Sequence, residues 1–298
     1  FNTRVRRGQT VVLPEEEFMS DVYGWLAGCQ RDGGSLRTVP RPKTLADVSA
    51  RWSEAMMEAI DERTAVVNLS TVHWTDGLCF DVERIARRAR EVGALLVIDG
   101  TQSIGAMPFD YEAVRPDLLL AAAYKWFLGP YQIGVAIVGD RLLESGEPFE
   151  HHWSNRAGSE DTSQVGYQMA FRDGARRFDV GEHANDLPLS MLNASLEQVI
   201  EWRPERIESY CRALMAPLEA YLRTSRYRVY DADEHCPHIL GIRAQDEGLL
   251  DRLMSELNAR NVRVSARGTS VRVSPYLYNE AGDVEVLVDA LRAAAAKA

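Results

Sequence analysis

Three groups of polar residues each follow directly after an apolar run that has the composition of a buried strand. The groups are Ser70–Trp74 after Ala65–Leu69, Asp99–Gln102 after Leu95–Ile98, and Tyr124–Trp126 after Leu118–Ala122. In open parallel sheets, ligands bind beyond the carboxyl ends of the strands. We therefore expect these three groups to lie together at one edge of a sheet.

Lys125 is the residue in these groups whose chemistry is most distinctive. It ends an apolar strand between two aromatic residues, where desolvation lowers the pKa of an amine and suits it to forming an imine with a carbonyl group. Asp99 could hold a pyridinium nitrogen protonated, as a pyridoxal 5′-phosphate (PLP) ring requires. Each residue also has a structural explanation, because Asp99 could cap a helix and the Lys125 side chain could extend to solvent. Spacing alone leaves both explanations open.

The first two thirds of the chain alternate apolar strands with amphipathic helices. We expect strands at Thr10–Leu13, Leu36–Val39, Ala65–Leu69, Ala94–Ile98, Leu118–Ala122 and Val135–Val138. The expected helices are Met19–Cys29, a helix from Thr44–Asp47 to Ile60, and one capped by Asp81 that ends at Gly93. This pattern predicts an α/β fold with a mostly parallel sheet covered on both faces.

The last third of the chain has a different organisation. Residues 145–186 are polar and glycine-rich, which predicts functional loops. Two helices follow, one at 188–202 and one that continues through Leu222. The rest of the chain predicts a compact α+β unit. Its expected strands are Ile239–Ile242, Arg263–Ser265 and Val271–Ser274, and its expected helices are Leu249–Ala259 and one that begins at Val284. We predict a large domain over residues 1–200 and a small C-terminal domain over residues 201–298.

Composition excludes several classes of function. The net charge of −10 argues against nucleic acid as a partner, and no apolar run has the length of a membrane span. The four cysteines (Cys29, Cys79, Cys211 and Cys236) form no CxxC pair and have no histidine at ligand spacing, which predicts free thiols, no metal site and a reducing, cytoplasmic location. No GxGxxG follows an early strand, so a nucleotide-binding Rossmann enzyme is disfavoured.

The segments Leu96–Gly105 and Asp117–Pro130 resemble the aminotransferase class V family, whose members have PLP fold type I. Arg177–Gly181 with Asn185, and Val271–Asn279, resemble it as well. The nearest group contains cysteine desulfurases, selenocysteine lyases, isopenicillin-N-epimerase-like proteins and kynureninase. The resemblance implies PLP as cofactor, a small amino acid as substrate and a homodimer.

The resemblance also implies roles for individual residues. Lys125 would form the Schiff base and move the proton at the substrate α-carbon, Asp99 would pair with the pyridinium nitrogen, and Gln102 would donate to the phenolic oxygen. Arg272 would bind the substrate carboxylate, which its planar fork suits. Phe18 would stack on the cofactor ring or else pack in the core.

Thr71 and His73 lie in the loop that the family places beside the cofactor, and they would either contact the cofactor or stabilise that loop. Trp74, Trp153, Asn155 and Arg156 would line the substrate pocket or else a subunit interface.

The chain departs from the family pattern at the phosphate site. The N-terminal part of the family fold, with the turn that holds the phosphate, has no counterpart here. Ala122 replaces a hydroxyl residue, and Glu182 stands where other members offer a threonine to the partner's phosphate. Tyr124 precedes the lysine, as in kynureninase-like members, and with His183 it could supply compensating hydrogen bonds.

The loop before Arg272, Val264–Val271, lacks the nucleophilic cysteine of desulfurases, so cysteine desulfurase activity is disfavoured. Our leading hypothesis is a PLP-dependent aminotransferase. The alternatives are a C–S lyase or epimerase of the same family and, in a different class, a non-catalytic binding or regulatory module with the PLP fold.

Overall fold

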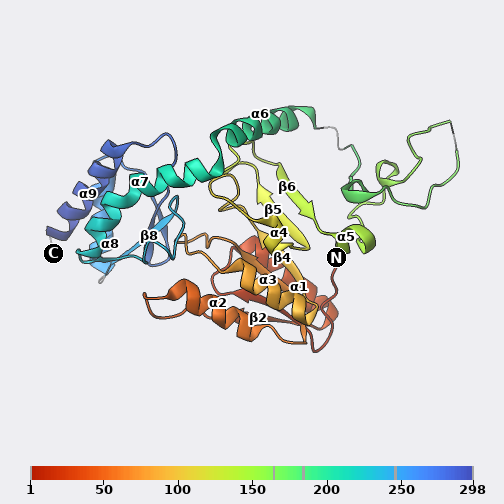
Figure 1. Cartoon of the computed structure of the whole chain (residues 1–298), viewed down its shortest axis with the longest axis horizontal. Coiled ribbons are helices and arrows are strands. Elements are labelled where there is room, and N and C mark those ends of the chain that lie inside the picture. The colour runs from red at the N-terminus through yellow and green to blue at the C-terminus, as the bar shows by residue number, and fades with distance from the viewer. Residues whose placement is uncertain (1, 164, 183–184, 245–246, 297–298) are drawn as a thin grey trace.

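The computed structural model describes residues 2–163, 165–182, 185–244 and 247–296. Its strands form a six-stranded sheet in the N-terminal part and a four-stranded sheet in the C-terminal part (Figure 1). The expected α/β architecture is confirmed. In the described part of the chain, no helix is long and apolar enough to cross a membrane, and no group of histidines, cysteines and acids could hold a metal ion.

The large sheet has the strand order β2-β1-β3-β4-β5-β6. Its strands are β1 (Thr10–Pro14), β2 (Ser35–Val39), β3 (Thr64–Ser70), β4 (Leu95–Asp99), β5 (Leu118–Ala122) and β6 (Gly134–Val138). The first five run parallel, and β6 is antiparallel to β5. Ser70 pairs with Asp99 in the register of β3 and β4, so the loops after these strands start side by side.

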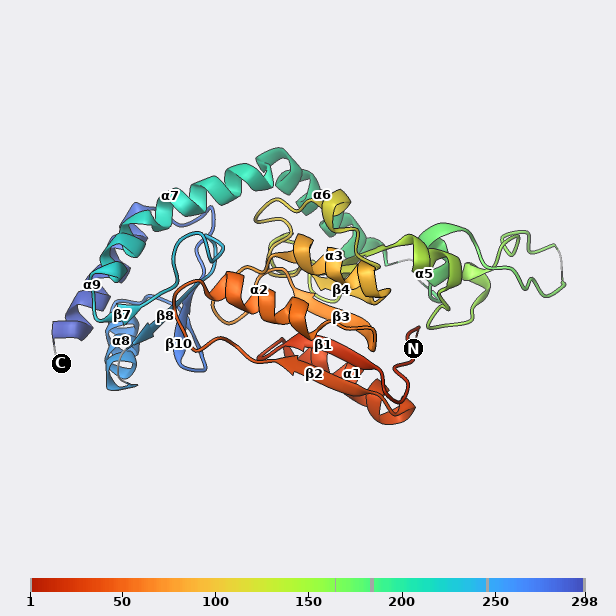
Figure 2. The same ribbon diagram turned by 60° about the horizontal axis from the view of Figure 1, so that its bottom comes forward.

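Helices cover the two faces of this sheet. Side chains of α2 (Val48–Ala59) and α3 (Val82–Val92) pack on one face, while α1 (Met19–Asp32) packs on β1 and β3 from the other (Figure 2). Helix α3 begins and ends as its sequence predicts. Asp81 accepts a hydrogen bond from the Arg84 amide at 3.1 Å, and Gly93 adopts a left-handed conformation with φ 74°.

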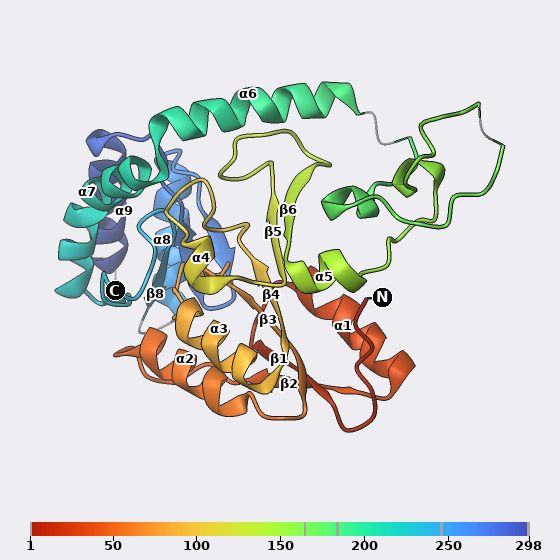
Figure 3. The same ribbon diagram turned by 45° about the vertical axis from the view of Figure 1, so that its right-hand side comes forward.

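The segment that connects the two sheets in sequence extends from the body of the protein on the side away from the small sheet (Figures 1 and 3). It follows the short helices α4 (Tyr111–Val114) and α5 (Asp140–Ser145) and contains the 3-10 turns η1 (Trp153–Asn155) and η2 (Gly174–Phe178). Helices α6 (Asp186–Trp202) and α7 (Pro204–Arg223) then lead to the small sheet, with a break at Arg203, whose φ is 68°.

The small sheet is antiparallel in the order β7-β8-β10-β9. Its strands are β7 (Tyr227–Arg228), β8 (Leu240–Ala244), β9 (Ser265–Arg267) and β10 (Ser270–Val273), and α8 (Glu247–Ala259) and α9 (Ala281–Ala296) pack on it with α7.

The sequence-based prediction of a strand at Arg263–Ser265 is wrong by two residues. The tight turn at Gly268–Thr269 pairs Arg267 with Ser270, so the strand pairing starts immediately beside the turn. This shift places Arg267 within the hairpin that also carries Arg272.

Candidate active site

The loops that follow β4 and β5 interlock at the edge of the large sheet. The Ala122 amide donates to Thr101 Oγ1 at 3.0 Å, and the Gly100 amide donates to the Leu120 carbonyl at 2.7 Å. Gly105, at φ +98°, lies so close to the second loop that an added Cβ would be 2.6 Å from the Trp126 carbonyl oxygen. This close approach fixes the turn that carries Asp99 against the turn that carries Lys125.

A cavity of about 460 Å³ opens at this edge, within the usual size range of small-molecule sites. Its lining includes five residues that the sequence predicts as site residues: Phe18, Asp99, Gln102, Tyr124 and Lys125. Asp21 of α1 and Thr101 line it too. The tertiary structure therefore gathers side chains from positions 18 to 125 around one space.

The Lys125 amine is half-buried in this cavity. Burial lowers its pKa, Arg272 and Arg267 lower it further, and the carboxyl groups of Asp99 and Asp21 act in the opposite direction. Its Nζ lies 5.7 Å from the Phe18 ring centroid and 5.8 Å from that of Tyr124. A desolvated amine between aromatic rings has the environment expected of an imine-forming lysine.

Asp99 faces two different partners. Its Oδ1 accepts a hydrogen bond from the Thr101 amide at 2.8 Å. Asp21, one helical turn after Phe18, brings a second carboxyl group against Asp99, and burial followed by the charges of Asp99 and Glu17 raises the pKa of Asp21 to about 8. The sequence pattern did not nominate Asp21.

Two arginines of the β9–β10 hairpin lie near Lys125. Arg272 Nη1 donates to the Trp74 carbonyl at 2.7 Å, and the Arg267 guanidinium lies 5.6 Å from the Trp74 ring centroid. Burial and the charge of Arg267 lower the pKa of Arg272. Each has a buried Nε without a hydrogen-bond partner, and no ion pair to either guanidinium occurs among the described residues. Two such cations beside an amine suit a substrate carboxylate.

Trp74 connects these arginines to the cavity. Its ring contacts Phe18 edge-on at 5.6 Å, and its Nε1 donates to the Glu16 carbonyl at 2.7 Å. Trp74 therefore contacts both Phe18, whose ring lies near the Lys125 amine, and the two guanidinium groups.

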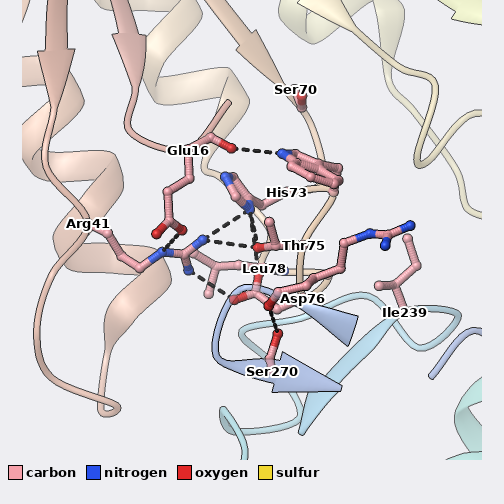
Figure 4. Close-up of polar contacts among 12 residues, drawn as sticks. Glu16, Arg41, Ser70, His73, Thr75, Asp76, Leu78, Ile239 and Ser270 are labelled. Carbon is pink, nitrogen blue, oxygen red and sulfur yellow. Dashed lines mark hydrogen bonds and ion pairs between the residues drawn. The ribbon is translucent and has the colours of Figure 1, made fainter. Parts of the chain in front are cut away.

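Thr71 and His73 do not line the cavity. The Thr71 amide donates to the Asp99 carbonyl at 3.2 Å, and its hydroxyl bonds the Ser103 hydroxyl. His73 is fully buried, with Nδ1 2.8 Å from Thr75 Oγ1 and 3.1 Å from Arg41 Nη2 (Figure 4). In this structure both side chains therefore make their hydrogen bonds within the protein.

The loop after β3 is held by a buried ion network (Figure 4). Asp76 accepts from Arg41 at 3.0 Å and from Tyr230 at 3.1 Å, and it pairs with Arg243 of β8. Burial alone would raise the pKa of Asp76, but the His73 ring, 3.7 Å away, and the two arginines hold it well below its usual range. The network joins the loop that carries Trp74 to the small sheet.

Gln102 is positioned from the C-terminal part of the chain. Its backbone carbonyl accepts a hydrogen bond from His238 Nε2 at 2.6 Å, and its side-chain oxygen accepts from Trp126 Nε1 at 3.4 Å. The His238 ring packs edge-on against Trp126 at 4.5 Å. Burial lowers the pKa of His238 to about 4, so the ring is neutral at neutral pH.

Three other nominated residues lie in the extended segment. Trp153 and Arg156 line a separate cavity of about 630 Å³, and Asn155 is buried, donating to the Glu150 and Asp179 carbonyls. The Glu182 side chain is exposed. His183 lies outside the described residues.

Three residues that line the cavity fit the ring of PLP. The Asp99 carboxylate suits a ring nitrogen, the Lys125 amine suits the aldehyde carbon, and the Phe18 ring offers an apolar face. Among the described residues that line the cavity, Lys125 is the one cation, and the Tyr124, Thr101 and Gln102 side chains supply neutral polar groups.

Sequence reasoning missed three residues of this site: Asp21, Arg267 and His238. Asp21 lies three residues after Phe18, and Arg267 lies five residues before Arg272. Their closeness in sequence to these candidate residues could have identified both. His238 lies 136 residues from its partner Gln102 and had none.

Comparisons with known proteins agree with this geometry. The sequence profile of the family described as "Aminotransferase class-V" matches residues 1–287. A probable cysteine desulfurase of Streptomyces coelicolor is 28% identical over 97% of this chain and 70% of its own length. The chain spans half the length of the cysteine desulfurases of Enterobacter and Shigella sonnei that it matches.

Solved structures show the same fold. The apo cysteine desulfurase of Thermococcus onnurineus superimposes with a TM-score of 0.83 at 18% identity, covering 99% of this chain and 76% of that one. The cystine C-S lyase C-DES, solved with its product cysteine persulfide, gives a TM-score of 0.81 at 18% identity, covering 96% of this chain and 75% of that one. With the family profile matched over almost the whole length of this chain, and with Lys125 and Asp99 lining one cavity, this chain belongs to the aminotransferase class V family of PLP-dependent enzymes.

Proposed function

We propose that this protein is a PLP-dependent C–S lyase that acts on a cysteine-type amino acid without a protein thiolate. The relatives named above are desulfurases and a C–S lyase, which supports the lyase hypothesis over the transamination that the sequence alone favours. The observation that carries the proposal is a cavity that contains Lys125 and Asp99 and is lined by no described cysteine.

The four thiols support this mechanism. Cys29, Cys211 and Cys236 are buried and Cys79 is half-buried. Burial raises the pKa of Cys79 to about 12 and that of Cys211 to about 11, and it raises the values of Cys29 and Cys236 as well. A thiol is nucleophilic as the thiolate. None of these thiols is therefore suited to attack a substrate sulfur.

Each residue of the site then has a task. When bound, PLP would supply the electron sink that makes the substrate α-proton removable. Lys125 would take that proton, Asp99 would hold the ring end, and Arg272 with Arg267 would bind the carboxylate. The sulfur group would then leave from the β-carbon with its bonding electron pair. For cystine, the balance is cystine plus water giving cysteine persulfide, pyruvate and ammonia.

A product assay separates the candidate reactions. The protein is loaded with PLP, incubated with cystine, cysteine or a 2-oxo acid plus an amino acid, and the products are identified by mass spectrometry. Pyruvate and ammonia with a persulfide indicate the lyase, and they persist in a variant with all four cysteines changed to serine. Alanine from cysteine would indicate a desulfurase, and exchange of amino and oxo groups an aminotransferase. Absence of every product, with PLP bound, would indicate a non-catalytic module. Lys125→Ala is the control for chemistry at this lysine.

We also propose that two copies of the chain associate through the extended segment. Val165, Tyr167 and Met169 are 98%, 97% and 77% exposed there, which is unusual for apolar side chains of a monomer. Sedimentation of the wild type and of a variant with serine at these three positions tests the proposal. We expect a dimer and a monomer, respectively, and a monomeric wild type contradicts it.

A further inference from the structure

Asp21 has a carboxyl group whose surroundings do not match an ordinary surface acid. It lies on α1 and lines the cavity together with Asp99. Its Oδ2 atom is buried and has no hydrogen-bond donor among the described residues. After burial, the charge of the Asp99 carboxyl group contributes most to raising the pKa of Asp21.

The other charged groups around Asp21 do not neutralise this pair. Glu17, one turn earlier, is buried, and its oxygens accept from the Ser70 amide, the Ser70 hydroxyl and the Phe18 amide at 2.9, 2.7 and 2.8 Å. Lys125 is the cation that acts on Asp21, and its attraction is smaller than the combined effect of burial and the two acids. Two carboxyl groups in contact cannot both be ionised at low cost, so they share a proton.

The hydrogen bonds indicate which of the two holds that proton. Asp99 Oδ1 already accepts from the Thr101 amide at 2.8 Å, a bond that favours the carboxylate form. Asp21 has no comparable donor for its buried oxygen. The proton therefore resides on Asp21, which then has a hydroxyl group to donate.

We propose that Asp21 is a positioning residue for Asp99, donating a hydrogen bond from its protonated carboxyl group to the carboxylate that Asp99 presents to the cofactor ring. This role rests on the proposed function only in taking Asp99 as the partner of the ring. The bond holds the Asp99 carboxylate in one orientation and keeps a single negative charge at that end of the cavity. When Asp21 loses its proton, the donor is lost and a second negative charge appears beside the first.

The first test uses the protein without cofactor. Infrared difference spectra of the wild type are expected to show one carboxylic acid C=O band that fades as the pH rises through about 8. Asp21→Asn should lack the band. Asp32→Asn, the same change at the other end of α1, should retain it. A wild-type spectrum identical to that of Asp21→Asn at every pH overturns the proposal.

The second test follows the visible absorption band of the bound cofactor against pH. The wild type should show an inflection from the titration of Asp21 that Asp21→Asn lacks, because the amide donates a hydrogen bond at every pH and carries no charge. Asp21→Leu, which has no donor, should differ from both already at neutral pH. If Asp21→Asn and Asp21→Leu both titrate as the wild type does, Asp21 has no influence on Asp99.

The third test is thermodynamic. Asp21 has a pKa of about 8 in the folded state against 3.8 in the unfolded chain, so between these values the folded state binds more protons. Wild-type stability should therefore fall as the pH rises from about 4 to about 8, relative to Asp21→Asn. A stability difference that does not change with pH contradicts a protonated Asp21. These results do not depend on turnover, so a protein that bears them out yet fails the product assay refutes only the proposed function.

Discussion

The guanidinium of Arg243, on β8 of the small sheet, is ion-paired with the fully buried carboxylate of Asp76 in the loop after β3 of the large sheet. Arg41 and Tyr230 bind the same carboxylate oxygen. One buried charge thus fixes the loop that carries Trp74 and, through the Trp74 carbonyl, supports Arg272.

Asp76→Asn should destabilise the protein strongly, because it leaves Arg41 and Arg243 without their buried counter-charge. Removing one partner of a buried ion pair costs about 3–5 kcal/mol. Urea unfolding measures the change. Glu54→Gln, which breaks an exposed pair with Arg84, is the control and should cost less than about 1 kcal/mol. Equal effects of the two substitutions would show that the Asp76 network contributes no more than a surface pair.

His238 should make stability depend on pH in the opposite direction to Asp21. Its pKa is about 4 in the folded state against 6.5 in the unfolded chain, so the unfolded state binds more protons between these values. The His238 contribution is complete above about pH 6.5 and is lost as the pH falls towards 4. His238→Gln should remove this part of the pH dependence in thermal unfolding. An unchanged slope between pH 4 and 6.5 would assign it to other groups.

Arg272→Lys should lower kcat/KM roughly 10- to 100-fold, chiefly through KM, because lysine cannot bind a carboxylate with two parallel hydrogen bonds. Arg267→Lys should have a smaller effect in the same direction. Arg263→Lys, an exposed position before the hairpin, should have none. A steady-state assay with the substrate found in the product screen measures all three. Wild-type values for Arg272→Lys would exclude it from carboxylate binding.

Gly105→Ala should disturb the Lys125 loop, since its Cβ would meet the Trp126 carbonyl at 2.6 Å. Gly158→Ala is a matched control, because Gly158 also has a positive φ, 76°, but has no atom within 4 Å of an added Cβ. Both variants carry the backbone strain of a left-handed alanine, about 1–2 kcal/mol. Only Gly105→Ala should also weaken PLP binding in a spectroscopic titration. Equal PLP affinity in both variants would mean that the two loops tolerate the contact.

Local pattern accounts for what could be predicted. The Asp81 cap, Gly93 and the apolar runs fixed α3, β4 and β5 to within a residue or two, because each signal lies inside its own element. The position of β9 was missed, because strand pairing across the Gly268–Thr269 turn depends on a partner strand that local composition does not reveal.

The site divides in the same way. The sequence by itself determined that Asp99 and Lys125 would meet, because parallel neighbouring strands end at one edge whatever packs around them. Only the tertiary structure decided that His73 would be buried in an ion network, that Arg267 would join Arg272, and that Asp21 would face Asp99. Burial and the approach of two charges depend on how distant elements pack, and they set which acid keeps its proton.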